Sequence, residues 1–120
     1  MSGFPAAVSC TISGRSGGVC EVCGANLARQ KHHRRPRQAG GSRRDDTNTA
    51  ANGLDVCHGC HHLIEMNRAL AYLVGWLLPQ TQLPDRQRVL RRGDYVLLDN
   101  DGGIHLDTSI EIQLDRKSVV

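Results

Sequence analysis

The chain has 120 residues, enough for one domain, and an aromatic content of 3% leaves few large side chains to fill a core. Its N-terminus has no charged start followed by a long apolar run, so we expect no secretory signal, and the apolar stretch at 70–78 is too short to span a bilayer. The net charge of +3 excludes little by itself. We therefore expect a soluble, cytoplasmic protein without a membrane partner, in which disulfides are rare and clustered cysteines indicate metal.

Three regions follow one another along the chain. We expect a flexible N-terminal tail at residues 1–18, in which Cys10 is a free thiol. The main domain is expected at residues 19–78, and a linker with a C-terminal β-hairpin extension at residues 79–120.

Four of the five cysteines form two CxxC pairs, "CEVC" at 20–23 and "CHGC" at 57–60. A CxxC turn directs two thiolates at one point, and two such turns together make a tetrahedral four-sulfur site that suits zinc. The alternative, a thioredoxin-like redox pair, fits poorly because there are two motifs and no βαβ pattern around either. The sequence therefore predicts one structural Zn²⁺ bound by Cys20, Cys23, Cys57 and Cys60.

Between the two cysteine pairs we expect a strand at Asn26–Arg34, a long turn-rich loop at 37–53, and a short strand at 54–57. Seven basic residues and no acidic one lie between positions 29 and 44. They are Arg29, Lys31, Arg34, Arg35, Arg37, Arg43 and Arg44. Such a block is usually a solvated face, but beside histidines and cysteines it favours a phosphodiester substrate.

A helix is predicted after the second cysteine pair, ending before Pro79. Its apolar face at helical spacing comprises Leu63, Met66, Leu70, Leu73 and Leu77, widened by Ile64 and Val74. Residues 79–92 are the expected linker, and "DNDGG" at 99–103 predicts a hairpin turn. In that hairpin the side chains of Tyr95 and Leu97 would share faces with Ile104 and Leu106. Residues 110–114 alternate and suggest a third strand.

The histidines complete an ordered pattern: His32, His33 and Pro36 before the loop, Asn52 five residues before Cys57, and His61 directly after the second CxxC. This pattern, within residues 20–78, closely resembles the HNH endonucleases, in particular the small enzymes of bacteriophages, some encoded beside the DNA-packaging terminase. The resemblance implies an α+β fold with a ββα-metal core. It also implies hydrolysis of DNA phosphodiester bonds to 5′-phosphate and 3′-hydroxyl ends.

The resemblance also implies roles for individual residues. His32 and His61 would bind a catalytic divalent ion (Mg²⁺, Mn²⁺ or Ni²⁺), and His33 would be the general base. His32 and His33 should point to opposite faces of their strand, so one would hold the ion while the other activates water. Asn52 would fix the loop and the geometry of His33. His62 is the alternative ligand to His61.

Other polar side chains would support this site. Arg34 and Arg35 would contact the phosphate, and Lys31, Arg34, Arg35, Arg37, Arg43 and Arg44 would bind DNA. Glu65 would orient His61 from one helical turn away. His58, inside the second CxxC, is expected on the surface. Asn67 is either a weak outer ligand of the ion or, the alternative we favour, a polar surface residue.

Two other classes of function fit parts of the pattern. A non-catalytic, zinc-stabilised DNA-binding module would need the cysteines and arginines but not the three histidines and Asn52 together. An assembly protein that docks on the terminase large subunit or the portal is compatible with catalysis, since packaging begins with DNA cutting.

Overall fold

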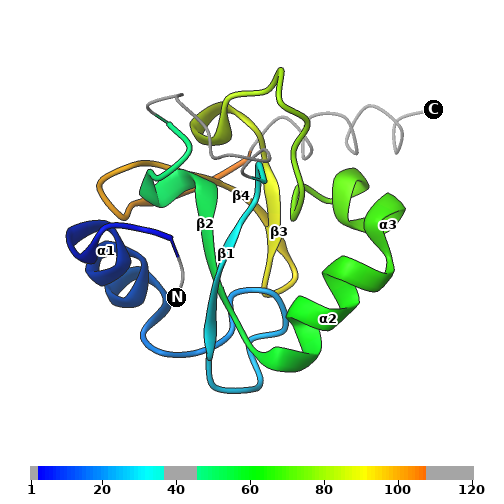
Figure 1. The fold of residues 1–120 in the computed structure, drawn as a ribbon, viewed down its shortest axis with the longest axis horizontal. Coiled ribbons are helices and arrows are strands. Elements are labelled where there is room, and N and C mark those ends of the chain that lie inside the picture. Colours follow the sequence, from blue (N-terminus) through cyan, green and yellow to red (C-terminus); the bar gives the residue numbers. More distant parts are fainter. Residues whose placement is uncertain (1–2, 37–45, 108–120) are drawn as a thin grey trace, which may run out of the picture.

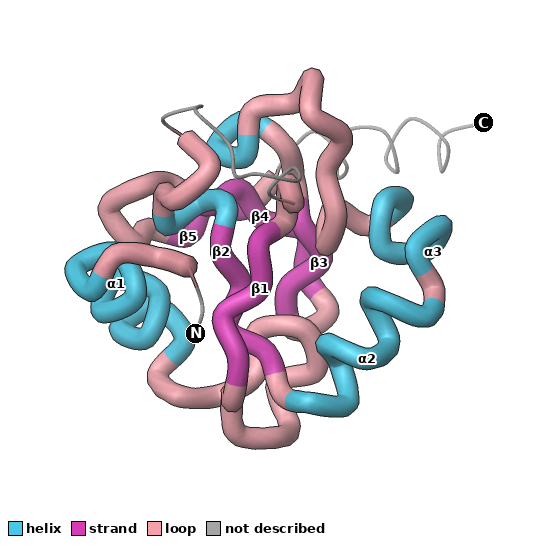
Figure 2. The backbone as a smooth tube through the Cα atoms, in the orientation of Figure 1, coloured by secondary structure: helices cyan, strands magenta, loops and turns pink. Residues whose placement is uncertain are grey.

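The computed structural model describes residues 3–36 and 46–107, which form a small α+β fold. Figures 1 and 2 show the chain path. The elements in chain order are α1 (Ala6–Ser16), β1 (Gln30–His33), η1 (Ala50–Asn52), β2 (Gly53–Val56), α2 (His58–Met66), α3 (Arg68–Leu73), η2 (Pro84–Arg86), β3 (Val89–Arg91), β4 (Asp94–Leu98) and β5 (Ile104–Leu106). Within the described residues, no helix is long and apolar enough to cross a membrane.

The antiparallel pair β1–β2 forms the centre of the molecule, with α1 against one side and α2 against the other (Figure 1). Its register sets Gln30 opposite Val56 and His33 opposite Gly53. The strand expected at Asn26–Arg34 is thus shorter, and only an isolated bridge between Val19 and Leu27 precedes it. Leu54 and Val56 of β2 are buried, so this strand anchors the hairpin in the core.

The prediction of a flexible tail at residues 1–18 was wrong, because α1 occupies most of this segment. Ile12 and Ser16, one turn apart, are the buried residues of this helix. Gly17 ends the helix with a left-handed φ of 65°, and its N–H donates to the Ser13 carbonyl oxygen. Small side chains give no strong helical period, which is why the sequence alone concealed the element.

The single helix predicted after the second cysteine pair is two helices with a break at Asn67, whose φ and ψ are −132° and 66°. The break changes which residues face inward. Ile64, Ala71 and Leu77 are buried, whereas Met66 and Leu73 are more than 70% exposed. Of the predicted apolar face, Leu63 is exposed as well. The prediction assumed one continuous helical period, and the interruption shifts the register.

The segment expected as a linker contains β3, which makes the C-terminal part a three-stranded antiparallel sheet in the order β3–β4–β5. Val89, Val96 and Leu98 from this sheet join Trp76 and Leu54 in the main core. This part of the protein therefore packs into the main core rather than forming a separate extension.

The hairpin β4–β5 forms around the predicted turn, but the residues that lie opposite each other on its two strands differ from the prediction. Val96 and Leu98, not Tyr95 and Leu97, lie opposite Leu106 and Ile104. Paired residues share a face of a sheet. The turn residues themselves set this register: Asp99 Oδ1 accepts from the N–H of Gly103. The strand suggested at 110–114 lies outside the described residues.

Arg34 lies inside the protein and is fully buried. Its guanidinium donates to five carbonyl oxygens within 3.3 Å, contributed by Gly75, Ala51, Pro84, Gln87 and Arg88. Gly75 has a φ of 85°, and a Cβ there would lie 2.1 Å from the Arg88 carbonyl oxygen. One arginine thus organises the turn after α3 and the approach to β3, where apolar side chains could not satisfy so many acceptors.

This environment predicts that Arg34→Met lowers the free energy of unfolding by at least about 3 kcal/mol, because it leaves buried carbonyl groups without donors. Arg29→Met, at an exposed arginine, is the matched control and should change stability little. Chemical unfolding of the two variants measures the difference. A stable Arg34→Met protein with weakened DNA binding would instead place this side chain on the phosphate.

Candidate metal centre and histidine pocket

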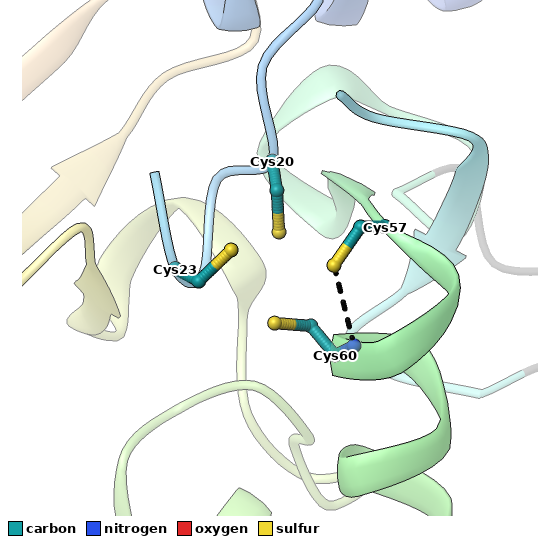
Figure 3. A group of neighbouring side chains, drawn as sticks. All are labelled: Cys20, Cys23, Cys57 and Cys60. Atoms are coloured by element: carbon teal, nitrogen blue, oxygen red, sulfur yellow. Dashed lines mark hydrogen bonds between the residues drawn. The ribbon is translucent and has the colours of Figure 1, made fainter. Parts of the chain in front are cut away.

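Cys20, Cys23, Cys57 and Cys60 converge, with their sulfur atoms all within 4.8 Å of one another (Figure 3). Two come from the turn after α1, and two from the junction between β2 and α2. The Cys57 sulfur also accepts a hydrogen bond from the Cys60 N–H at 3.4 Å and caps α2. This cluster could hold a metal ion, and four thiolates in tetrahedral reach are the donor set of a structural zinc site.

The cysteines differ in how easily they ionise. The backbone N–H of Ala25 is the largest influence on Cys23 and lowers its pKa to about 6. Burial opposes ionisation of Cys57, but hydrogen bonds from Cys60 and Asn26 lower its pKa overall. Burial and the neighbouring sulfurs raise the pKa of Cys60 far above its ordinary value. Four thiolates repel one another at this distance, and a divalent cation removes that repulsion.

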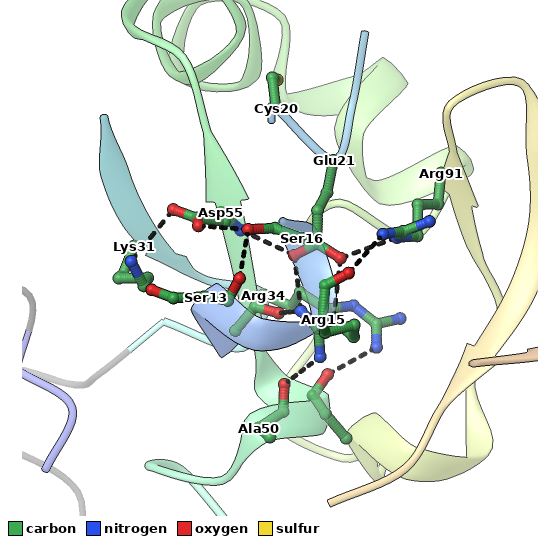
Figure 4. Close-up of polar contacts among 12 residues, drawn as sticks. Ser13, Arg15, Ser16, Cys20, Glu21, Lys31, Arg34, Ala50, Asp55 and Arg91 are labelled. Carbon is green, nitrogen blue, oxygen red and sulfur yellow. Dashed lines mark hydrogen bonds and ion pairs between the residues drawn. The ribbon is translucent and has the colours of Figure 1, made fainter. Parts of the chain in front are cut away.

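A network of buried charges fixes the first cysteine turn to its neighbours (Figure 4). The Glu21 carboxylate accepts from Arg15 and Arg91 at 2.7–2.8 Å and from the N–H of Asp55 at 3.0 Å. Burial raises the pKa of Glu21, yet the hydrogen bonds and charge of Arg15 outweigh it, and the pKa falls below its ordinary value. Asp55 in turn accepts from Ser16 and pairs with Lys31. The network joins α1, the first cysteine turn, β2 and β3.

His32, His33 and His61 line one open pocket of about 270 Å³ between β1 and α2. The rings of His32 and His61 are 5.5 Å apart between centroids at an angle of 61°. A larger pocket of about 420 Å³, lined by Tyr72, Arg86 and Arg88 among others, has no histidine or cysteine in its wall. The three-histidine pocket is therefore the candidate site.

His32 is buried, and its Nε2 lies 2.8 Å from the Trp76 carbonyl oxygen. A carbonyl only accepts, so Nε2 carries the proton and Nδ1 has the lone pair of the neutral ring. Burial lowers the pKa of His32 to about 4, which keeps the ring neutral near pH 7. A neutral imidazole whose other N–H donates to a backbone carbonyl is the usual form of a histidine that binds metal.

His33 ends β1 and faces different neighbours from His32. Its Nε2 lies 3.0 Å from Asn48 Oδ1, and its ring is stacked on that of Phe4. The two adjacent histidines thus make their contacts on different sides of the strand, as alternation requires, and both reach the pocket.

Asn52 lies fully buried beneath the end of β1. Its Oδ1 accepts from the Arg35 N–H at 2.7 Å, and its Nδ2 donates to the carbonyl oxygens of Arg35 and Thr47. The side chain therefore ties the residues that follow His33 to the returning loop before β2.

The prediction that Arg34 and Arg35 contact a phosphate at the pocket is wrong, because neither side chain lines it. Both are fully buried; Arg34 binds the carbonyl groups described above, and Arg35 pairs with Asp46 and donates to the Gln82 carbonyl oxygen. After His33 the chain turns into the core, where Asn52 binds the backbone of Arg35. The side chains of Arg34 and Arg35 are therefore shielded from solvent. Arg37, Arg43 and Arg44 lie outside the described residues.

The basic side chains that do line the pocket are Lys31 and Arg68. Lys31 pairs with Asp55 at 3.2 Å, while exposed Arg68 lies near Tyr72, its Nη2 3.4 Å from the hydroxyl. Sequence reasoning missed Arg68. The sequence carries no local signal for it, because the break at Asn67 separates the helix of His61 from the helix of Arg68.

The histidines of α2 differ in whether they line the pocket. His61 lines the pocket, and its Nε2 is 3.5 Å from a Glu65 carboxylate oxygen. His62 and His58 are exposed, as is Asn67. The geometry thus favours His61 over His62 as the histidine that acts with His32.

A comparison of the chain with models of protein families, with curated proteins and with solved structures found no match.

Cys57→Ser should remove one sulfur ligand while its hydroxyl oxygen can still cap α2. Structural zinc supplies folding free energy on the order of 10 kcal/mol in small peptides, so this variant should lose zinc and unfold at a much lower temperature. Cys10→Ser, at an exposed cysteine outside the cluster, is the control and should keep both properties. Zinc content per chain and thermal unfolding are the measurements; full zinc content in Cys57→Ser would contradict the four-cysteine site.

Proposed function

We propose that the chain is a metal-dependent DNA endonuclease of the HNH type, with a ββα-metal site formed by β1, β2 and α2. The observation that carries the proposal is the convergence of His32, His33 and His61 on one open pocket. Buried core histidines would not need an opening to solvent, and surface histidines would not need fixed partners at Trp76 and Asn48.

His32 and His61 would hold the divalent ion, since their rings lie 5.5 Å apart in the same pocket and come from the strand and the helix. Two imidazoles leave most coordination positions for water and substrate oxygens. The ion would supply stabilisation of charge on the phosphoryl oxygens and on the leaving 3′ oxygen. Ni²⁺ suits imidazole ligands, whereas Mg²⁺ and Mn²⁺ would take most of their ligands from water and phosphate oxygens.

His33 would remove a proton from the attacking water, because a neutral imidazole is a competent base near neutral pH. Asn52 would keep the residues after His33 in place and so maintain the position of the base. Arg68 would hold a DNA phosphate at the pocket entrance, in the role that the sequence suggested for Arg34 and Arg35.

The four-cysteine site would serve the fold rather than the reaction. Four sulfur ligands complete a tetrahedral zinc site and leave no position for water or substrate. Because Cys57 joins β2 to α2, zinc there would fix the angle between the helix that carries His61 and the hairpin in which β1, paired with β2, carries His32.

The alternative of a non-catalytic DNA-binding module is less well supported by the geometry. Such a module would use Arg34 and Arg35 to bind DNA, but both side chains are buried and hydrogen-bonded inside the protein. Docking on a terminase large subunit or a portal stays a prediction from the resemblance and is compatible with cleavage.

The proposal predicts that zinc-loaded protein cuts supercoiled plasmid in the presence of Mg²⁺, Mn²⁺ or Ni²⁺, and that a chelator stops the reaction. His33→Ala should lower the cleavage rate by roughly 10²–10⁴-fold while zinc content, folding and DNA affinity are kept, because the base acts only in the transition state.

His61→Ala should also stop cleavage, but through weaker binding of the divalent ion. His62→Ala is its matched control, one position away on the exposed face of α2, and should cut almost normally. Cleavage by His33→Ala at the wild-type rate would overturn the mechanism. Loss of ion binding in His62→Ala, but not in His61→Ala, would show that the ligand is His62 rather than His61.

Arg68→Met should weaken binding to unrelated DNA sequences to a similar degree and lower the slope of log affinity against log salt by about one. Arg29→Met, at an exposed arginine outside the pocket, is the control. Binding isotherms at several salt concentrations measure the slope. An unchanged slope in Arg68→Met would show that this side chain does not contact a phosphate.

A further inference from the structure

The ring of His33 is held by a residue from the far N-terminal end of the described chain. Phe4 stacks on it with 4.0 Å between ring centroids and 7° between ring planes. Phe4 itself is buried and packs with Ile12 and Ala50, with Val8 beside them. The aromatic ring is thus fixed by its own small apolar cluster, and it in turn covers one face of the imidazole.

The hairpin leaves space for this stack. Gly53 lies opposite His33 in the register of β1 and β2. A Cβ on Gly53 would come within 2.4 Å of the Ile12 side chain and 3.0 Å of the Phe4 ring. Glycine at this position therefore admits the N-terminal segment to the side of the strand on which His33 lies.

A second contact fixes the rotation of the same ring. Asn48 Oδ1 lies 3.0 Å from His33 Nε2. An amide oxygen accepts, so Nε2 carries the proton and Nδ1 is the nitrogen with the lone pair. The stack fixes the plane of the ring, and the hydrogen bond fixes which nitrogen faces which direction.

We propose that Phe4 is a positioning residue for the base His33, acting together with Asn48 to hold the imidazole plane and its Nε2–H tautomer. The inference rests on the proposed nuclease function. The N-terminal segment then belongs to the active site, where it keeps the Nδ1 lone pair aimed at the attacking water. Phe4 touches neither substrate nor ion in this role.

The test compares Phe4→Leu, Phe4→Tyr and Val8→Ala in zinc-loaded protein under single-turnover plasmid cleavage. Phe4→Leu keeps an apolar side chain but removes the flat partner. It should lower the single-turnover rate constant about 10- to 100-fold and leave the half-saturating protein concentration unchanged. Phe4→Tyr keeps the ring and should retain activity. Val8→Ala loosens the same cluster without touching His33 and should cut normally.

A second readout does not depend on cleavage. The ¹⁵N chemical shifts of the His33 ring report its tautomer, and Asn48→Ala, at a partly exposed residue, should mix the two neutral tautomers while the protein stays folded. Phe4→Leu should shift the His33 ring signals through loss of the stacked ring, and Val8→Ala should not.

The outcomes separate the two proposals. Normal cleavage and unshifted His33 signals in Phe4→Leu would overturn the positioning role and leave the nuclease proposal standing. Equal loss of activity in Phe4→Leu, Phe4→Tyr and Val8→Ala would show that the cluster acts only through stability. Failure of the wild-type protein to cut with any of the three ions would overturn the nuclease function, and the positioning role with it.

Discussion

The convergence of four sulfur atoms at the start of α2 is the constraint on which the remaining geometry depends. Cys57 is both the residue after β2 and the cap of α2, so the position of its sulfur determines how the helix leaves the strand. In a chain with four aromatic side chains, apolar packing supplies limited resistance to a change in that angle. The distance between the rings of His32 and His61 is set by the same junction, since one lies on the hairpin and the other on the first turn of the helix.

Buried charged side chains with complete hydrogen bonding also hold the fold in place. Arg15 and Arg91 converge on Glu21, and Arg34 serves five carbonyl oxygens in the turns around β3. Isolated charges inside a protein are costly, whereas charges with complete hydrogen bonding are tolerated and fix one arrangement of the chain. These contacts explain how a protein with short strands and few large side chains holds its loops in defined positions.

Much of the site could be predicted from the sequence because its chemistry leaves a strict pattern. Two CxxC pairs predicted the cysteine cluster, and the ordered set of His32, His33, Asn52 and His61 marked the strand end, the loop and the helix that the structure brings together. The roles of these residues in catalysis stay predictions. Local spacing constrains such residues strongly, since a ligand or a buried amide fits in few places.

The incorrect predictions concern residues whose roles depend on distant parts of the chain. Arg34 and Arg35 look like phosphate contacts in sequence, but the acceptors that bury them come from segments up to 54 positions away. The break at Asn67 and the helix α1 are likewise decided by packing, because neither has a strong local signal. Arg68 lines the histidine pocket, and Phe4 stacks on His33, only through the tertiary fold.

We propose two separate metal sites in this chain, a sulfur site that stabilises the fold and an imidazole site that serves the reaction. Anomalous diffraction from crystals of zinc-loaded protein soaked in Mn²⁺ tests this proposal most directly. We expect a zinc peak among Cys20, Cys23, Cys57 and Cys60 and a distinct manganese peak between His32 and His61. Manganese bound elsewhere, or zinc peaks only, with nothing between the two imidazoles at saturating Mn²⁺, would contradict it.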